Sequence, residues 1–102
     1  MSEGRVTLGA AGELRLSGVL DYQTGPALLG AGKTLIDQST ASPVVVDCSA
    51  VEKSTSVGIS LLLAYMRQAA RKQRTLRVIH LPEEMLHIAE VSGLKGILPV
   101  EG

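Results

Sequence analysis

The sequence predicts an α/β fold: a mixed β-sheet with helices packed mainly on one face, in the order β-β-α-β-α-β-α. Short segments rich in alternating or β-branched apolar residues come before segments with helical spacing of apolar residues, and this alternation repeats along the chain. The 102 residues, 45% of them hydrophobic, suit one core. We see no linker, repeat or low-complexity tract, so residues 1–102 are expected to form a single domain.

A hairpin is predicted first. Val6-Thr7-Leu8 and Leu14-Arg15-Leu16 alternate apolar and polar residues on either side of Gly9-Ala10-Ala11-Gly12, which is typical of two short strands joined by a turn. We expect Gly18 to close the second strand. Because this hairpin precedes the β-α-β part of the chain, the predicted sheet is mixed.

A first helix is predicted next, with Thr24 as its cap and Pro26 in its first turn. Its apolar residues recur at helical spacing: Leu28, Leu29, Ala31, Leu35 and Ile36. Glycines interrupt the pattern, and each interior glycine costs about 0.5–1 kcal/mol relative to alanine. We therefore expect this helix to be the least stable of the domain. Residues 39–43 are expected to form a loop.

The rest of the chain predicts two strands and two helices. Val44-Val45-Val46 is a continuous β-branched run typical of a central strand, and Leu76–Ile79 is expected to lie parallel to it after a right-handed crossover. The intervening helix should start at Ser56 and run to about Gln73, with this apolar stripe: Ile59, Leu62, Leu63, Met66, Ala69 and Ala70. Pro82-Glu83-Glu84 should start the third helix and Gly93 end it, before a short apolar tail that packs back.

Composition limits the function. The formal net charge is zero and the only aromatic residues are two tyrosines, so nucleic acids and anionic membranes are not expected partners. The single cysteine, Cys48, excludes an internal disulfide and fits a reducing compartment. Neither a signal-peptide pattern at residues 1–5 nor an apolar run long enough to span a bilayer is present, so we expect a cytoplasmic protein without direct membrane insertion.

No catalytic, metal-binding or cofactor-binding residues are predicted. Gly32-Lys33-Thr34 suggests a phosphate-binding loop, but Ala27 stands where that motif needs glycine and no buried strand precedes it. His80 and His87 lack the spacing of a ligand pair. Cys48 is expected to be a small buried residue rather than a nucleophile. We therefore expect that the chain is not an enzyme.

The hydroxyl cluster Ser54-Thr55-Ser56 has two interpretations. Serine and threonine are common helix caps, each contributing about 1 kcal/mol, so the cluster can be purely structural. Alternatively it is a docking site or a switch. A phosphoryl group there would be stabilised by the helix N-terminus while placing about two negative charges on a contact surface.

The order of short motifs resembles the STAS domain family. Val44-Val45-Val46-Asp47 matches the family's apolar strand and its acid, and Ser56-Val57-Gly58-Ile59 matches the hydroxyl, glycine and apolar residue at the start of the following helix. Segments near both ends, Leu16–Asp21 and Ser92–Val100, match as well. The resemblance implies one STAS domain over residues 1–102. It places Ser56 at the family's phosphorylatable position, while Thr55 replaces the acid that precedes it.

Within the family, the chain most resembles the small STAS subunits of bacterial phospholipid ABC transporters. Single-domain length, the lost acid and the helix from Ile59 to Tyr65 favour them over anti-sigma-factor antagonists. The resemblance implies that the chain binds the transporter's ATPase subunit, in a complex that also contains permease and lipid-binding subunits. This complex would lie at the inner membrane and would help to maintain the lipid asymmetry of the outer membrane. The expected partner-binding or switch residues are Ser54, Thr55, Ser56, Gly58, Ser60, Tyr22 and Arg67.

Two other functions stay open on the sequence. The first is an anti-sigma-factor antagonist regulated by phosphorylation at Ser56, with a kinase as its partner. The second is a small nucleotide-binding enzyme that uses Gly32-Lys33-Thr34.

Overall fold

A five-stranded sheet in the order β1-β2-β3-β4-β5 organises the computed structural model of the chain, which describes residues 2–101. The elements are β1 (Arg5–Leu8), β2 (Leu14–Leu20), α1 (Gly25–Gln38), β3 (Val44–Ser54), α2 (Ser56–Arg71), β4 (Leu76–Ile79), α3 (Glu83–Val91) and β5 (Val100–Glu101). β1 is antiparallel to β2, and all other neighbouring strands are parallel. The predicted mixed α/β fold is confirmed.

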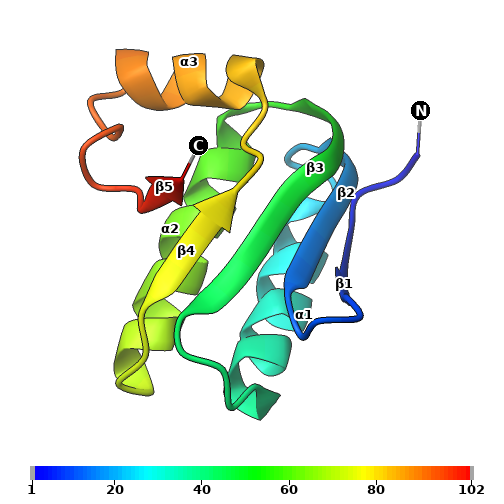
Figure 1. Ribbon diagram of the computed structural model, residues 1–102. Coiled ribbons are helices and arrows are strands. Elements are labelled where there is room, and N and C mark those ends of the chain that lie inside the picture. Colours follow the sequence, from blue (N-terminus) through cyan, green and yellow to red (C-terminus); the bar gives the residue numbers. More distant parts are fainter. Residues whose placement is uncertain (1, 102) are drawn as a thin grey trace.

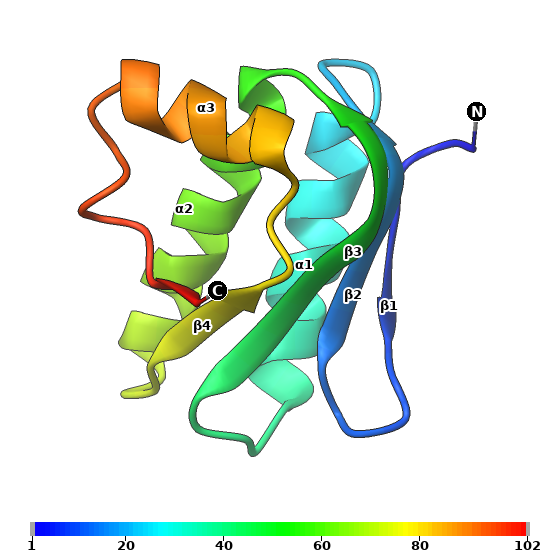
Figure 2. The same cartoon turned by 45° about the horizontal axis from the view of Figure 1, so that its top comes forward.

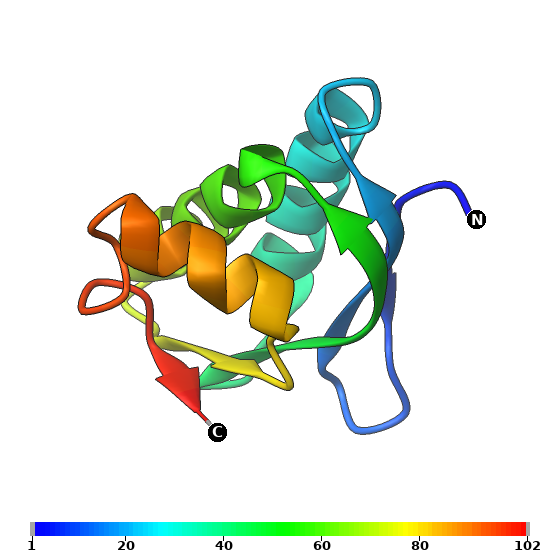
Figure 3. The ribbon, with the colours of Figure 1, turned by 90° about the horizontal axis from the view of Figure 1, so that it is seen from above.

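The helices cover one face of the sheet. Figure 1 shows α1 and α2 behind the strands, and Figure 2, turned by 45°, shows the same arrangement with α3 across the upper end of the molecule. Seen from above in Figure 3, α1 and α2 lie side by side. Because each follows a strand of the parallel part of the sheet, both helices begin at the same end. That end therefore gathers the loop after β2 and the start of α2.

An aliphatic core fills the space between the sheet and the helices. In β2, Leu14, Leu16 and Leu20 are fully buried, whereas Arg15 between them is exposed, as strand alternation requires. The buried apolar residues of the other elements include Val44, Val46, Cys48, Ile36, Ile59, Leu62, Tyr65, Val78, Met85 and Leu98. No helix formed by residues 2–101 lies over the opposite face of the sheet (Figure 1).

Two strands are longer than predicted. Gly18 does not close β2: its φ of 76° accompanies a register shift, and the strand continues to Leu20. A Cβ atom at Gly18 would collide with the backbone carbonyls of Ser2 and Glu3, so a glycine is needed where the N-terminal segment passes. β3 likewise runs on to Ser54, because it keeps pairing with β2 as far as Leu20. Most of the segment after Asp47 is therefore strand, although the sequence predicts a strand only at Val44–Val46.

The buried face of α2 is wider than the predicted stripe. Ile59, Leu62 and Ala69 are buried as predicted, but Ala70 is exposed and Tyr65 is fully buried. Leu61 and Gln68 are also buried, while Leu63 and Met66 are only half-buried. α2 packs against α1 as well as against the sheet, so its buried face extends toward α1.

The C-terminal elements agree with the sequence, with one addition. β4 has the predicted bounds, and α3 ends before Gly93, whose φ is 73°. The predicted apolar tail contains a fifth strand, because Val100 pairs with Val78 of β4. α2 ends at Arg71 rather than near Gln73.

Candidate docking surface on the first two helices

The start of α2 is fixed to the end of β2 by Thr55. Thr55 is the N-cap residue in extended conformation, and its hydroxyl accepts a hydrogen bond from the Val57 amide at 3.2 Å. Its own amide donates to the Leu20 carbonyl at 3.0 Å. Ser56 follows as the first helical residue with an exposed side chain. The cap is thus Thr55, which leaves the Ser56 hydroxyl at the surface of a helix N-terminus.

The predicted site residues near this helix start fall into an exposed group and a buried group. Thr55, Ser56 and Ser60 are exposed. Ser54 is only 4% exposed, and its hydroxyl donates to the Thr55 carbonyl at 2.7 Å. Gly58 is also buried: a Cβ atom there would collide with the Ser54 hydroxyl and lie 2.8 Å from a Met85 methyl carbon. Ser54 and Gly58 therefore shape the turn beneath the surface.

An open groove of about 520 Å³ lies between α1 and α2, next to this helix start. Its lining is mostly apolar and includes Leu29, Val57 and Leu61. Three residues that the sequence had singled out separately also line it: Tyr22, Ser60 and Arg67. The structure thus brings these three predicted residues together, whereas the exposed Thr55 and Ser56 are not part of the lining. We refer to the six named lining residues and the space between them as the α1–α2 groove.

The groove exists because the two helices approach closely where they begin. A Cβ atom at Gly25 would lie 3.0 Å from a Val57 methyl carbon, so the small residue permits the contact. Further along, the Tyr65 ring occupies the place of a side chain at Gly32, and its hydroxyl donates to the Leu28 carbonyl at 2.6 Å. Tyr22 stands at the rim and is 77% exposed, which is unusual for a large aromatic residue.

Sequence reasoning missed the apolar floor of this groove. Leu29, Val57 and Leu61 were not singled out as site residues, although two of them are only half-buried. The available signal was the width of the apolar face of each helix. A helix that packs on a sheet alone needs one stripe, and additional apolar residues beside that stripe indicate a second contact.

Positive side chains line the continuation of the groove. Lys33 of α1 and Arg67 and Arg71 of α2 border a second hollow of about 280 Å³. Within residues 2–101, none of these three has a carboxylate within ion-pair distance. The nearby Asp37 carboxylate accepts a hydrogen bond of 2.6 Å from the Gln68 amide. We call Lys33, Arg67 and Arg71 the cationic end of the groove.

Gly32-Lys33-Thr34 does not form a phosphate-binding loop. The three residues lie inside α1, where the Thr34 hydroxyl donates to the Gly30 carbonyl at 3.0 Å and Gly32 is covered by the Tyr65 ring. The strand–loop–helix form that the motif requires is therefore missing here. In the part of the chain from residue 2 to residue 101, no three His, Cys, Asp or Glu side chains are grouped as metal ligands.

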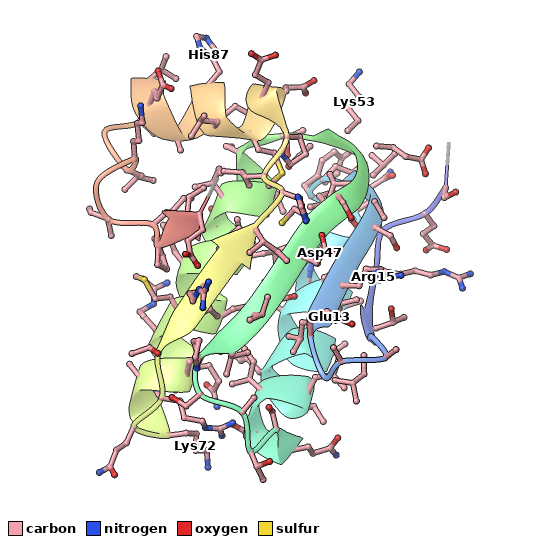
Figure 4. All side chains as sticks on the ribbon, viewed as in Figure 1. Glu13, Arg15, Asp47, Lys53, Lys72 and His87 are labelled. Atoms are coloured by element: carbon pink, nitrogen blue, oxygen red, sulfur yellow. The ribbon has the colours of Figure 1, made fainter. Side chains whose placement is uncertain are left out.

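Charged residues also lie on the uncovered sheet face. Asp47 and Arg15 are neighbours in the β2–β3 register, and Figure 4 shows them on the face turned away from α1 and α2. Burial would raise the pKa of the Asp47 carboxyl, but hydrogen bonds from Ser49 and the charges of His80 and Arg15 outweigh it and hold that pKa below its ordinary value.

Cys48 has the properties of a core residue. Burial, with a smaller contribution from the charge of Asp47, raises the pKa of its thiol to about 12. The thiol therefore stays protonated at neutral pH, as expected for a structural cysteine. No helix in the described part of the chain, residues 2–101, has the length and apolar character needed to cross a bilayer.

Comparisons with known proteins identify the family. The family model described as Mlab, STAS domain (STAS_2) matches residues 4–99. A chain of the Acinetobacter MlaFEDB complex in its ATP-bound Vtrans2 conformation has a TM-score of 0.82 and 27% sequence identity, covering 95% of this chain and 99% of that chain. No curated protein sequence matches the chain.

Anti-sigma factor antagonists have the same fold. The crystal structure of one from Mycobacterium paratuberculosis has a TM-score of 0.75 and 26% identity over 96% of this chain and 83% of that chain. Unphosphorylated SpoIIAA has a TM-score of 0.71 at 17% identity, over 98% and 89% respectively, which supports the fold alone. The family model spans nearly the whole described chain. The chain belongs to the Mlab-type STAS domain family.

Proposed function

We propose that the chain is the STAS accessory subunit of an Mla-type phospholipid ABC transporter. It binds the MlaF-like ATPase subunit and supports the assembly and activity of a complex with permease and lipid-binding subunits. In this role it is cytoplasmic, held at the inner membrane by its partner, and serves the maintenance of outer-membrane lipid asymmetry. It has no catalytic residues of its own.

One observation carries the proposal: three of the exposed residues predicted for partner binding line a single, mostly apolar groove. Tyr22 of the loop after β2 borders the same space as Ser60 and Arg67 of α2. Large exposed aromatic residues beside apolar pockets are typical anchors of protein interfaces. The likeness to a chain of the MlaFEDB complex, which extends over nearly the full length of both chains, supports a partner from a complex of this kind.

Thr55 favours this function over the antagonist. An anti-sigma-factor antagonist regulated at Ser56 is the second candidate, supported by the exposed hydroxyl at the start of α2 and the 26% identity to a mycobacterial antagonist. Here, however, the position of the family's acid is occupied by Thr55, whose hydroxyl caps the helix instead. That substitution argues against a kinase-regulated site.

Reconstitution tests the proposal. The tagged chain is co-expressed with the ATPase and permease subunits of the Mla-type transporter from the same source, and separately with an anti-sigma-factor kinase. We expect a stable complex with the transporter subunits, and lower ATP hydrolysis when the chain is omitted. A complex with the kinase and none with the ATPase would instead assign the antagonist function.

A further inference from the structure

We propose that the α1–α2 groove accepts an amphipathic segment of the ATPase subunit in which acidic side chains follow the apolar ones, the acids meeting the cationic end formed by Lys33, Arg67 and Arg71. This inference rests on the proposed function and specifies the chemistry of the partner. The groove has an apolar half near Tyr22, and it continues into a positive half near Arg71.

The fold explains only one of the three cations. Arg71 lies in the last turn of α2, where a positive charge offsets the helix dipole, but Arg67 is a full turn earlier and Lys33 is in the interior of α1. Arg67 and Arg71 are spaced at i and i+4, an arrangement in which like charges destabilise the helix. Two further cations do have structural partners: Arg74 donates to the Ser39 carbonyl, and Arg77 pairs with Glu101.

The neighbouring acid does not neutralise the cationic end. Asp37 is the carboxylate of α1 closest along the chain to Lys33, and it is hydrogen-bonded to Gln68 at 2.6 Å. Lys33, Arg67 and Arg71 thus border one hollow without an ion-pair partner among residues 2–101. Repulsion between them is relieved when a partner supplies carboxylates.

The apolar half decides between a protein and a lipid surface. Leu29 lines both hollows, so the apolar and positive parts form one continuous track between two helices. A track of this kind fits an amphipathic helix, which presents side chains at i, i+3, i+4 and i+7. Anionic lipid surfaces attract clusters of about 4–8 cations, and this chain has zero net charge and three cations here. The chemistry therefore favours an acidic amphipathic segment of a protein.

Charge reversal tests the inference. The affinity of the purified ATPase subunit is measured by calorimetry for the wild type, Arg67→Glu, Lys33→Glu and the control Arg5→Glu. Arg5 is an exposed cation of β1, and because it alternates with the half-buried Val6 it lies on the uncovered sheet face. We expect both groove variants to bind at least about tenfold more weakly, with a weaker dependence on salt, and Arg5→Glu to bind like the wild type.

Further arms keep the outcome interpretable. Arg67→Lys retains the charge and should stay within about threefold of the wild type, and melting temperatures show that each variant is folded. Groove variants that bind as tightly as Arg5→Glu would overturn the inference while leaving the proposed function intact. Wild-type chain that does not bind the ATPase would overturn both. Phosphatidylglycerol vesicles that bind the wild type but not Arg67→Glu, with unchanged ATPase affinity, would assign the cationic end to lipid and also overturn it.

Discussion

At the scale of the residue, Gly32 and Tyr65 determine how closely α1 and α2 pack. The ring of Tyr65, in α2, lies where a side chain at Gly32 of α1 would be. Its buried hydroxyl donates a hydrogen bond to the carbonyl of Leu28, which is also in α1. The glycines of α1 weaken it as an isolated helix, yet Gly32 allows the tertiary contact. Gly30, two residues earlier, has open space around it.

Alanine substitutions at these two glycines should have opposite effects. Gly32→Ala forces a methyl group into the Tyr65 ring and should lower the free energy of unfolding by about 1–3 kcal/mol. Gly30→Ala removes conformational freedom from the unfolded chain without a clash and should raise it by about 0.5–1 kcal/mol. Urea denaturation of both variants measures this. Equal effects at the two positions would mean that Tyr65 does not occupy that space.

Asp47 should make the stability of the domain depend on acid pH. Its carboxylate is favoured in the folded state, so its contribution is fully present above the ordinary pKa of 3.8 and is lost as pH falls through the lower folded pKa. Asp47→Asn should therefore be less stable than the wild type near neutral pH, with the difference shrinking below pH 3.8. Denaturation curves across that range test this, and a difference independent of pH would contradict it.

At the scale of the element, α2 shows what a pattern along one helix leaves undetermined. Apolar spacing located the helix and much of its buried face, but not its contact with α1. That contact depends on Gly32 and Gly25, which belong to α1. In the sequence, these glycines indicate only that their own helix is less stable. The same limitation applies to Gly58, where a side chain would collide with the Ser54 hydroxyl and with Met85 of α3.

The corrected face of α2 predicts different responses to an introduced charge. Leu62 is fully buried, so Leu62→Asp should abolish folding, since a buried unpaired carboxylate costs several kcal/mol. Ala70 is exposed, so Ala70→Asp should cost only about 1–2 kcal/mol, from the helix dipole and the lower helix propensity of aspartate. Circular dichroism melting curves compare the two. If Ala70→Asp also unfolds the protein, Ala70 is buried, as the apolar stripe predicted from the sequence requires.

Substitutions at the N-terminus of α2 distinguish a residue that caps the helix from one that contacts the partner. Because Thr55 supplies the cap, Ser56→Ala should leave stability nearly unchanged, whereas Thr55→Ala should lose about 1 kcal/mol. Ser56→Asp should fold as well as the wild type or better, because an acid suits a helix N-terminus. It should bind the ATPase at least about tenfold more weakly, since a desolvated charge at an interface is costly. Thr40→Asp, in the exposed loop after α1, is the control. Unchanged affinity in Ser56→Asp would leave Ser56 outside the interface.

At the scale of the whole molecule, the sequence was sufficient for the fold class and for most of the element order. Local signals such as the Val44–Val46 run, and the Pro82 and Gly93 that flank α3, have their cause within the segment itself. β5 was not predicted, because a two-residue strand is defined by its pairing with Val78 rather than by its own pattern. The extension of β3 beyond Asp47 was not predicted for the same reason. Its residues are largely polar, and they form a strand because they pair with β2.

The docking surface was predictable only in part. Tyr22, Ser60 and Arg67 could each be named from the sequence, but their meeting in one groove follows from the parallel arrangement of α1 and α2. The parts of the chain that form the groove are far apart in sequence. A linear pattern shows which side chains are exposed, while the packing of elements decides which of them share a surface.

The affinity of the ATPase subunit for Tyr22→Ala tests the central claim, that this chain binds its partner through the α1–α2 groove. Tyr22 is 77% exposed, so its loss should leave the melting temperature unchanged, and Val91→Ala, at a 72% exposed residue of α3, is a matched apolar truncation elsewhere. We predict at least about tenfold weaker binding for Tyr22→Ala and wild-type binding for Val91→Ala. Equal affinities for the wild type and both variants would contradict the claim.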